Sequence, residues 1–124
     1  HWVVANLPAD LTEIAAGSFA DGVVARGQQV AAGPHGSAQG RNDYTGWFAG
    51  DPDMEGDYYG YDGPCPPWND SIVHHYVFTV FALSVPQIEL PPGFTGAELR
   101  DAIAGLTLDQ ASVTGLYTLN SRLL

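Results

Sequence analysis

The residues best suited to chemistry in this chain are two histidines and a proline-rich turn. His1 opens the sequence, His74 begins an apolar run, and between them stands the turn Gly63-Pro64-Cys65-Pro66-Pro67. Imidazole N–H groups and the backbone amides of such turns donate hydrogen bonds to anions. Each proline fixes φ, so the turn is rigid before a ligand binds. The residues alone are compatible with an anion site and equally with two ordinary, hydrogen-bonded histidines at strand ends.

The charge of the chain limits what it can bind. Four arginines and no lysine face 14 acidic residues, for a formal net charge of −10. Nucleic-acid binding and polybasic membrane anchoring both need many cations, so we exclude both. The field of the whole chain repels anions, and any attraction must therefore be local. A small anion held by histidines is compatible with this balance.

Cys65, in the proline-rich turn, and His75, next to His74, could have other roles. Cys65 could act as a thiol nucleophile, but no Asn or Asp that would orient a base is evident, and flanking prolines are typical of a static turn. His75 follows His74 on a strand, so its side chain points to the opposite face and we interpret it as structural or exposed. We expect a binding protein with no cofactor and no enzymatic activity.

An acidic segment resembles a calcium loop. From Asp51 to Asp62, acids fall at positions 1, 3, 5, 7 and 12 with glycine at position 6. Flanking helices are not predicted, proline stands at position 2, and Asp replaces the long Glu at position 12. We expect a metal-free loop, and ligand spacing gives no specific support to a metal site of histidines and Asp. Arg41 and Arg122 are expected to be solvated, the alternative being that they pair with acids or brace the loop.

Several elements must position these residues. Strands are predicted at 2–7 and 112–119, weakly at 22–30, and most clearly at 72–83, where apolar side chains on both faces indicate a central strand covered on both sides. A short helical turn is predicted at 11–14. Residues 31–70 are rich in Gly, Pro and Asp and predict a long, ordered loop without a helix. Its aromatic side chains are expected to hold it: Tyr44, Trp47, Phe48, Tyr58, Tyr59, Tyr61 and Trp68.

A capping box predicts the start of one helix. Thr95 and Glu98 have the Ser/Thr-x-x-Glu spacing, and apolar residues then recur at i, i+3, i+4 and i+7 from Leu99 to Leu106. The chain as a whole suits a single domain over residues 1–124, and its longest apolar run is too short to span a membrane. Because it opens mid-strand and without methionine, we expect a processed or truncated product, whose cellular compartment is unknown.

These motifs together resemble the phosphatidylethanolamine-binding protein family, and more narrowly its bacterial branch named for Raf kinase inhibitor protein. The resemblance rests on residues 60–67 followed by His74-His75-Tyr76-Val77-Phe78, on residues 1–8, on residues 40–44 and on residues 115–120. It implies a mainly β fold, with a central antiparallel sheet, a smaller second sheet and short peripheral helices. The implied ligand pocket comprises His1, Gly63, Pro64, Cys65, Pro66, Pro67, His74 and Tyr76.

The resemblance also implies binding partners, and the sequence departs from the family pattern at two motifs. It covers the C-terminal two-thirds of a family domain, so a second chain is a candidate source of the missing N-terminal strands. The family's Asp-Pro-Asp-x-Pro motif and its histidine near Leu106 are absent. We expect a small anionic ligand such as a phosphorylated headgroup. The alternative is an interaction module that inhibits a kinase or protease through the same surface. Residues 1–4 are expected inside the sheet, next to the strand at 76–83.

Overall fold

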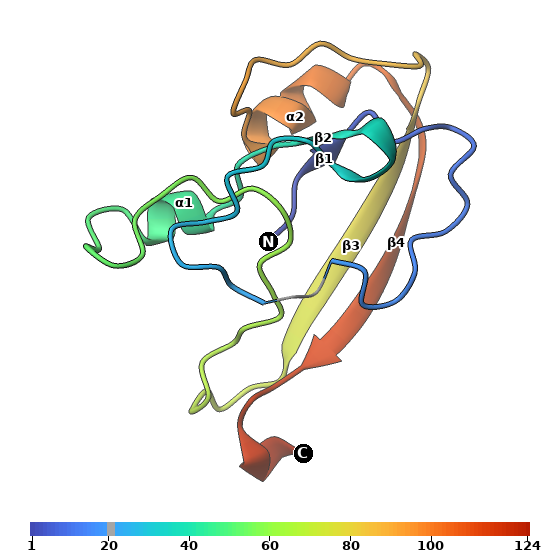
Figure 1. Cartoon of the computed structure of the whole chain (residues 1–124). Coiled ribbons are helices and arrows are strands. Elements are labelled where there is room, and N and C mark those ends of the chain that lie inside the picture. Colours follow the sequence, from blue (N-terminus) through green and yellow to red (C-terminus); the bar gives the residue numbers. More distant parts are fainter. Residues whose placement is uncertain (20–21) are drawn as a thin grey trace.

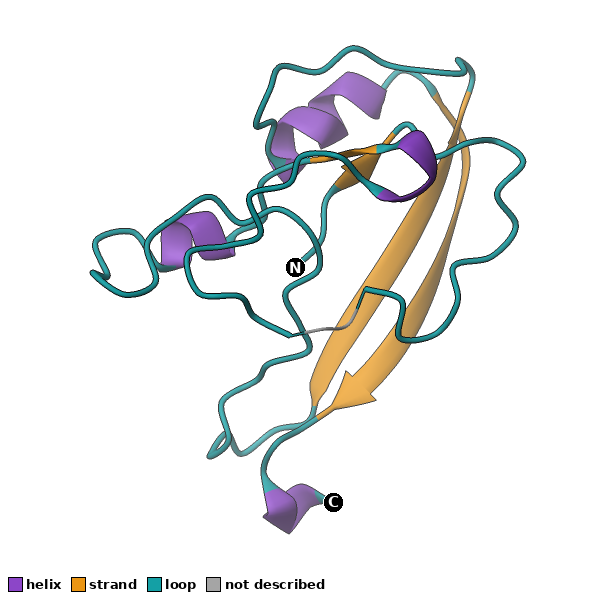
Figure 2. Ribbon diagram, in the orientation of Figure 1, coloured by secondary structure: helices purple, strands orange, loops and turns teal. Residues whose placement is uncertain are grey.

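The computed structural model describes residues 1–19 and 22–124, and consists mainly of strands and ordered loops (Figures 1 and 2). A larger antiparallel sheet pairs β3 (His74–Leu83) with β4 (Thr107–Tyr117), and a smaller one pairs β1 (Val4–Ala5) with β2 (Ala38–Gln39). The helices are short: η1 (Pro34–Gly36), α1 (Tyr44–Trp47), α2 (Gly96–Ile103) and η2 (Ser121–Leu123). The predicted architecture of two antiparallel sheets with peripheral helices is confirmed.

The β3–β4 ribbon is the longest feature of the molecule (Figure 1). Its aromatic and β-branched residues favour extended backbone, and its register pairs Tyr76 with Gly115 and Phe78 with Val113. The strand predicted at 72–83 begins two residues later, at His74. The strand predicted at 112–119 begins earlier and ends earlier, at 107 and 117, because pairing with β3 extends it through a stretch that has no apolar pattern of its own.

The prediction that β3 is a central, covered strand is wrong for this chain. Among the described residues β3 pairs with β4 alone. Val77 and Val80 are 62% and 60% exposed. The apolar sequence predicts burial, whereas the residues present here do not provide the layers that would produce it.

The N-terminal segment is ordered, but it does not join the β3 sheet as predicted. The strand predicted at 2–7 is reduced to Val4–Ala5, which pairs with β2. Asn6 ends it by adopting a left-handed φ of 61°. The Asn6 side chain then donates to the Ile88 carbonyl and accepts from the Ile88 N–H, both at 2.9 Å. These two bonds fasten the segment to a residue 82 positions away.

Two other predicted elements are wrong. Residues 11–14 form no helical turn, and residues 22–30 form no strand apart from an isolated bridge between Gln28 and Tyr59. Positive φ angles at Arg26 and Gly27 turn the backbone there and prevent regular pairing. Residues 31–70 are mainly loop, as predicted, but they include β2 and α1, although no helix was predicted there. Asn42 helps α1 to begin, because its Oδ1 accepts the Tyr44 N–H at 3.0 Å.

The long loop is packed around a cluster of aromatic rings. Tyr58 is fully buried and packs against Phe48 and Tyr44, with centroids 5.4 and 5.9 Å away. Its hydroxyl donates to the Met54 carbonyl at 2.6 Å. The expectation that aromatics hold the loop therefore applies to these rings. It fails for Trp47 and Trp68, which are 79% and 74% exposed.

The predicted capping box is present at the start of α2. The Thr95 hydroxyl accepts the Glu98 N–H at 3.3 Å, and the Glu98 carboxylate accepts the Thr95 N–H at 2.7 Å. Ile103, one of the predicted apolar positions, is buried. The local sequence thus sets where this helix begins and which face it turns inward.

A candidate anion site between two histidines

His1 is held in one orientation by its neighbours. Its Nδ1 lies 2.9 Å from the Asp62 carbonyl oxygen, and its ring makes edge contacts with Tyr44 and Tyr76 at 5.5 and 5.2 Å. A carbonyl oxygen can only accept a hydrogen bond, so Nδ1 carries the proton. The Nε2 atom of a neutral His1 is therefore an acceptor, and it becomes a donor when the ring is protonated.

His74 is held in a similar way, through its other nitrogen. Its Nε2 lies 2.8 Å from Asp70 Oδ2, and that hydrogen bond lowers the pKa of the Asp70 carboxyl. An ionised carboxylate only accepts, so Nε2 carries the proton. Asn120 fixes the Asp70 backbone by donating to its carbonyl at 2.8 Å. The His74 ring lies 6.4 Å from the Tyr76 ring, so Tyr76 contacts both histidines.

A buried carboxylate, that of Asp62, directly precedes the proline-rich turn and is held by Asn42. Asp62 has no solvent exposure, and Asn42 Nδ2 donates to its Oδ2 at 2.7 Å. The same Nδ2 lies 3.1 Å from the Gly60 carbonyl and 3.3 Å from that of His1. Asp62 Oδ1 is buried without a hydrogen-bond partner in the part of the chain that the structure describes. Burial raises the pKa of Asp62, partly offset by the bond from Asn42.

The proline-rich turn continues directly from Asp62. Gly63 and Pro66 are buried, Pro64 is half-buried, and Cys65 and Pro67 are exposed. A Cβ atom at position 63 would lie 3.0 Å from His1 Nδ1, so glycine allows the ring to approach the turn closely. The structure thus brings His1, Gly63 and Tyr76 together, with His74 beyond Tyr76, while Cys65 and Pro67 are turned toward solvent.

Two tyrosine hydroxyls add neutral donors near the histidines. Burial raises the pKa of Tyr44 to about 12 and also raises the pKa of Tyr76. Both phenols therefore keep their protons at neutral pH and can donate hydrogen bonds. Sequence reasoning identified Tyr76 but missed the roles of Tyr44, Asn42, Asp62 and Asp70. The Asp-x-x-x-His spacing of Asp70 and His74 was a local signal that could have been used.

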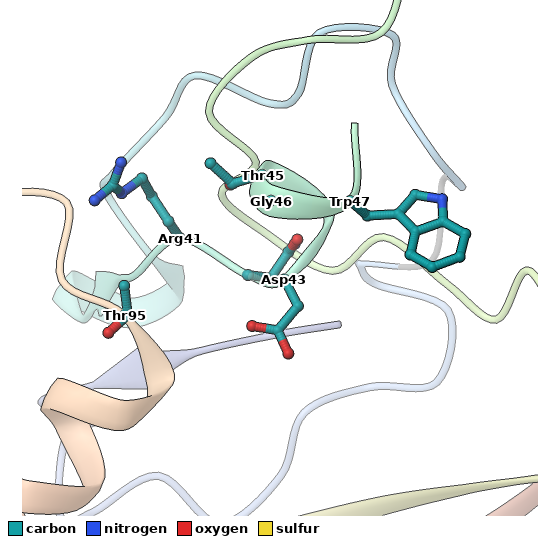
Figure 3. A pocket seen from close by; sticks show the side chains of 7 residues that line it. Arg41, Asp43, Thr45, Gly46, Trp47 and Thr95 are labelled. Carbon is teal, nitrogen blue, oxygen red and sulfur yellow. The ribbon is translucent and has the colours of Figure 1, made fainter. Parts of the chain in front are cut away.

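Two hollows lie outside the predicted site. A groove of about 530 Å³ lies over α1 and is shown in Figure 3, where the Trp47 ring points away from Arg41. Arg41 braces the loop, which was the alternative to the solvated role expected for it: its Nε donates to the Gly93 carbonyl at 2.8 Å and its guanidinium pairs with Asp57 at 3.4 Å. A second hollow of about 280 Å³ is bordered by Tyr61 and Gln39. The linings of both omit His1, His74 and Tyr76.

The acidic segment is organised by its own backbone. Asp51 Oδ1 accepts the N–H groups of Asp53 and Met54 at 2.9 and 3.0 Å, so this carboxylate already has internal partners. Within residues 1–19 and 22–124, no group of three or more His, Cys, Asp or Glu side chains is arranged to hold a metal ion. Across the same residues, every helix is too short or too polar to cross a bilayer.

Comparison with known proteins now identifies the family. Residues 1–118 match the family model described as "Phosphatidylethanolamine-binding protein". The chain belongs to this family. Among curated members, Escherichia coli (strain K12) YbhB is 34% identical over 118 residues, which cover 95% of this chain and 61% of YbhB. A Mycobacterium tuberculosis (strain H37Rv) protein named "Putative lipoprotein LppC" is 33% identical over 117 residues, covering 94% of this chain and 44% of that protein.

A solved structure of a phosphatidylethanolamine-binding protein agrees with the fold. The E. coli protein YbcL, described as "a new member of the mammalian PEBP family", superposes with a TM-score of 0.59 at 26% identity. The superposition covers 95% of this chain and 60% of YbcL. The chain therefore spans about three fifths of the length of YbhB and YbcL.

Proposed function

We propose that this phosphatidylethanolamine-binding protein binds a small phosphate-bearing anion, such as a phosphoethanolamine headgroup, beside His1, Gly63, His74 and Tyr76. The observation that supports the proposal is the pairing of each histidine with a protein acceptor. The Asp62 carbonyl holds His1 Nδ1 and the Asp70 carboxylate holds His74 Nε2. Each ring therefore offers its second nitrogen, His1 Nε2 or His74 Nδ1, to a ligand.

Protonation decides what these nitrogens can do. In the neutral form the one proton of each ring is already used, so the remaining nitrogen presents a lone pair and repels an anionic oxygen. In the protonated form it donates a charge-assisted hydrogen bond. Histidine has an ordinary pKa of about 6.5. Anion binding should therefore strengthen as pH falls from about 8 to about 6.

Titration with phosphate and phosphoethanolamine at both pH values tests the proposal. His74→Ala should weaken binding at the lower pH by about 1.5–3 kcal/mol, the scale of a hydrogen bond to a charged group. The matched control is His75→Ala, because His75 is exposed on the opposite face of β3. Sulfate carries no proton in this range, so its binding should report histidine protonation alone. Equal affinities in all three proteins at both pH values would contradict the proposal.

A second function is favoured by one observation at the same place. Trp68 is 74% exposed and directly follows the proline-rich turn. Exposed tryptophans are frequent anchors in protein–protein interfaces. We therefore propose as the alternative a protein-binding surface around this turn. It predicts that Trp68→Ala weakens binding of a protein partner while phosphate affinity is unchanged.

A further inference from the structure

The position of the proton on His74 depends on one hydrogen bond to a residue outside β3. A neutral histidine carries its proton on either ring nitrogen, and the partner of one nitrogen decides which. Here the partner is Asp70 Oδ2, 2.8 Å from Nε2. The two side chains are 29% and 30% exposed, so water can compete for this bond. The bond therefore orients the ring only while Asp70 itself is held in place.

Asp70 lies in the irregular segment between the proline-rich turn and β3, and its backbone is held from two sides. Its N–H donates to the Pro67 carbonyl at 3.2 Å. Its carbonyl accepts Asn120 Nδ2 at 2.8 Å, from a residue 50 positions further along the chain. Figure 1 shows this C-terminal part beside the end of the ribbon where β3 begins. Asn120 therefore joins the segment of Asp70 to the residues that follow β4.

Asn120 is itself fixed by both ends of its side-chain amide. Its Oδ1 accepts the Arg122 N–H at 3.0 Å, while its Nδ2 donates to Asp70. Its backbone N–H donates to the Thr118 hydroxyl at 3.1 Å, and Thr118 is buried. Rotation of the amide would break both side-chain bonds. A side chain that is locked in this way is suited to hold another group in position.

We propose that Asn120 is a positioning residue for the anion site and acts on His74 through Asp70. By holding Asp70 it keeps the His74 proton on Nε2 and leaves Nδ1 for the ligand, which Asn120 itself does not contact. The bond to His74 lowers the pKa of the Asp70 carboxyl, as expected of a carboxylate engaged by the ring. This role rests on the proposed function as far as the ligand is concerned, whereas the proton position of His74 is independent of any ligand.

Nitrogen-15 NMR of the histidine rings at pH about 8 reports the proton position directly, because the ordinary histidine pKa is about 6.5 and neutral rings then predominate. His74→Ala assigns the His74 signal by its absence. In the unchanged protein we expect the Nε2–H tautomer of His74. Asn120→Ala should lower the ratio of the Nε2–H to the Nδ1–H tautomer by roughly threefold or more, the scale of one partly exposed hydrogen bond. Phosphate affinity at pH about 6 should fall by a similar factor.

Three further variants separate positioning from a general loss of structure. Asn120→Asp keeps the oxygen that accepts the Arg122 N–H but removes the donor to Asp70, so it should shift the tautomer ratio as Asn120→Ala does. Arg122→Ala is the matched control, because Arg122 donates to Asn120 from its backbone N–H, and it should change neither readout. In a chain that already carries Asp70→Ala, Asn120→Ala should change the ratio no further, since the carboxylate through which it acts is gone.

An unchanged tautomer ratio in both Asn120 variants would overturn the positioning role. So would a changed ratio that leaves phosphate affinity as it was, or an effect of Asn120→Ala that persists without the Asp70 carboxylate. If the unchanged protein binds no phosphate, the proposed anion site fails, while the tautomer ratio still decides whether Asn120 acts on His74. The two failures are therefore distinguishable.

Discussion

Replacing Asn42 by alanine removes the side chain that connects the buried carboxylate to the rest of the site. Asn42 donates to Asp62 Oδ2 at 2.7 Å and to the Gly60 carbonyl at 3.1 Å, and it accepts from the Tyr44 N–H at 3.0 Å. A hydrogen bond to a charged group contributes about 1.5–3 kcal/mol and a neutral one about 1 kcal/mol. Asp62 would also stay buried after losing this donor, with its Oδ1 already unpaired, so we expect a loss of about 3–5 kcal/mol in the free energy of unfolding.

Urea denaturation followed by tryptophan fluorescence measures this loss. The control is Asn69→Ala, which truncates an exposed asparagine and should change stability by less than about 0.5 kcal/mol. The double variant with Asp62→Ala should lose less than the sum of the two single changes, because one interaction is counted in both. A loss below about 1 kcal/mol for Asn42→Ala, or strict additivity, would refute the claim that Asn42 stabilises a buried charge.

Three further predictions follow from other contacts. Thr95→Ala removes the capping hydroxyl of α2 and should cost about 1 kcal/mol in the free energy of unfolding, measured by urea denaturation, with Thr12→Ala in an irregular segment as the control. The pKa of Asp62 is raised in the folded state, so its ionised form lowers the free energy of unfolding. This loss of stability should shrink as pH falls through the raised pKa, and it should vanish below the unfolded pKa of about 3.9. The stability gap between Asp62→Asn and the unchanged protein should therefore narrow as pH is lowered, and a constant gap would contradict the assignment. Calcium titration should give no submillimolar isotherm, since Asp51 already accepts two backbone N–H groups; such an isotherm, abolished by Asp51→Ala, would contradict this.

Features that depend on neighbours in sequence were predictable. The capping box placed the start of α2 correctly because both of its bonds lie within four residues. The composition of β3 identified a strand to within two residues at its start. The length of β4 and the partner of β1 were mispredicted, because both are decided by pairing with distant strands.

In the candidate site, too, some residues were predictable from the sequence and others were not. The residue types and motifs selected His1, His74 and Tyr76, and the structure places both histidines against that tyrosine. The groups that set the orientation of the histidine rings and support the turn were not predicted. Asn42 and Asp62 lie 20 positions apart, and His1 meets the Asp62 carbonyl across 61 positions. Such contacts arise from the packed loop and leave no periodic pattern in the sequence.

The two bonds between Asn6 and Ile88 have a consequence for the order in which the chain folds. They join residues that are 82 positions apart. The connection between β3 and β4, which contains α2, is much shorter, because β3 ends at Leu83 and β4 begins at Thr107. Closing a long loop costs more chain entropy, and distant contacts form more slowly than local ones. During synthesis, residue 6 emerges long before its partner exists. The bonds of Asn6 therefore cannot form until position 88 has left the ribosome, so this end of the N-terminal segment is fastened late in folding.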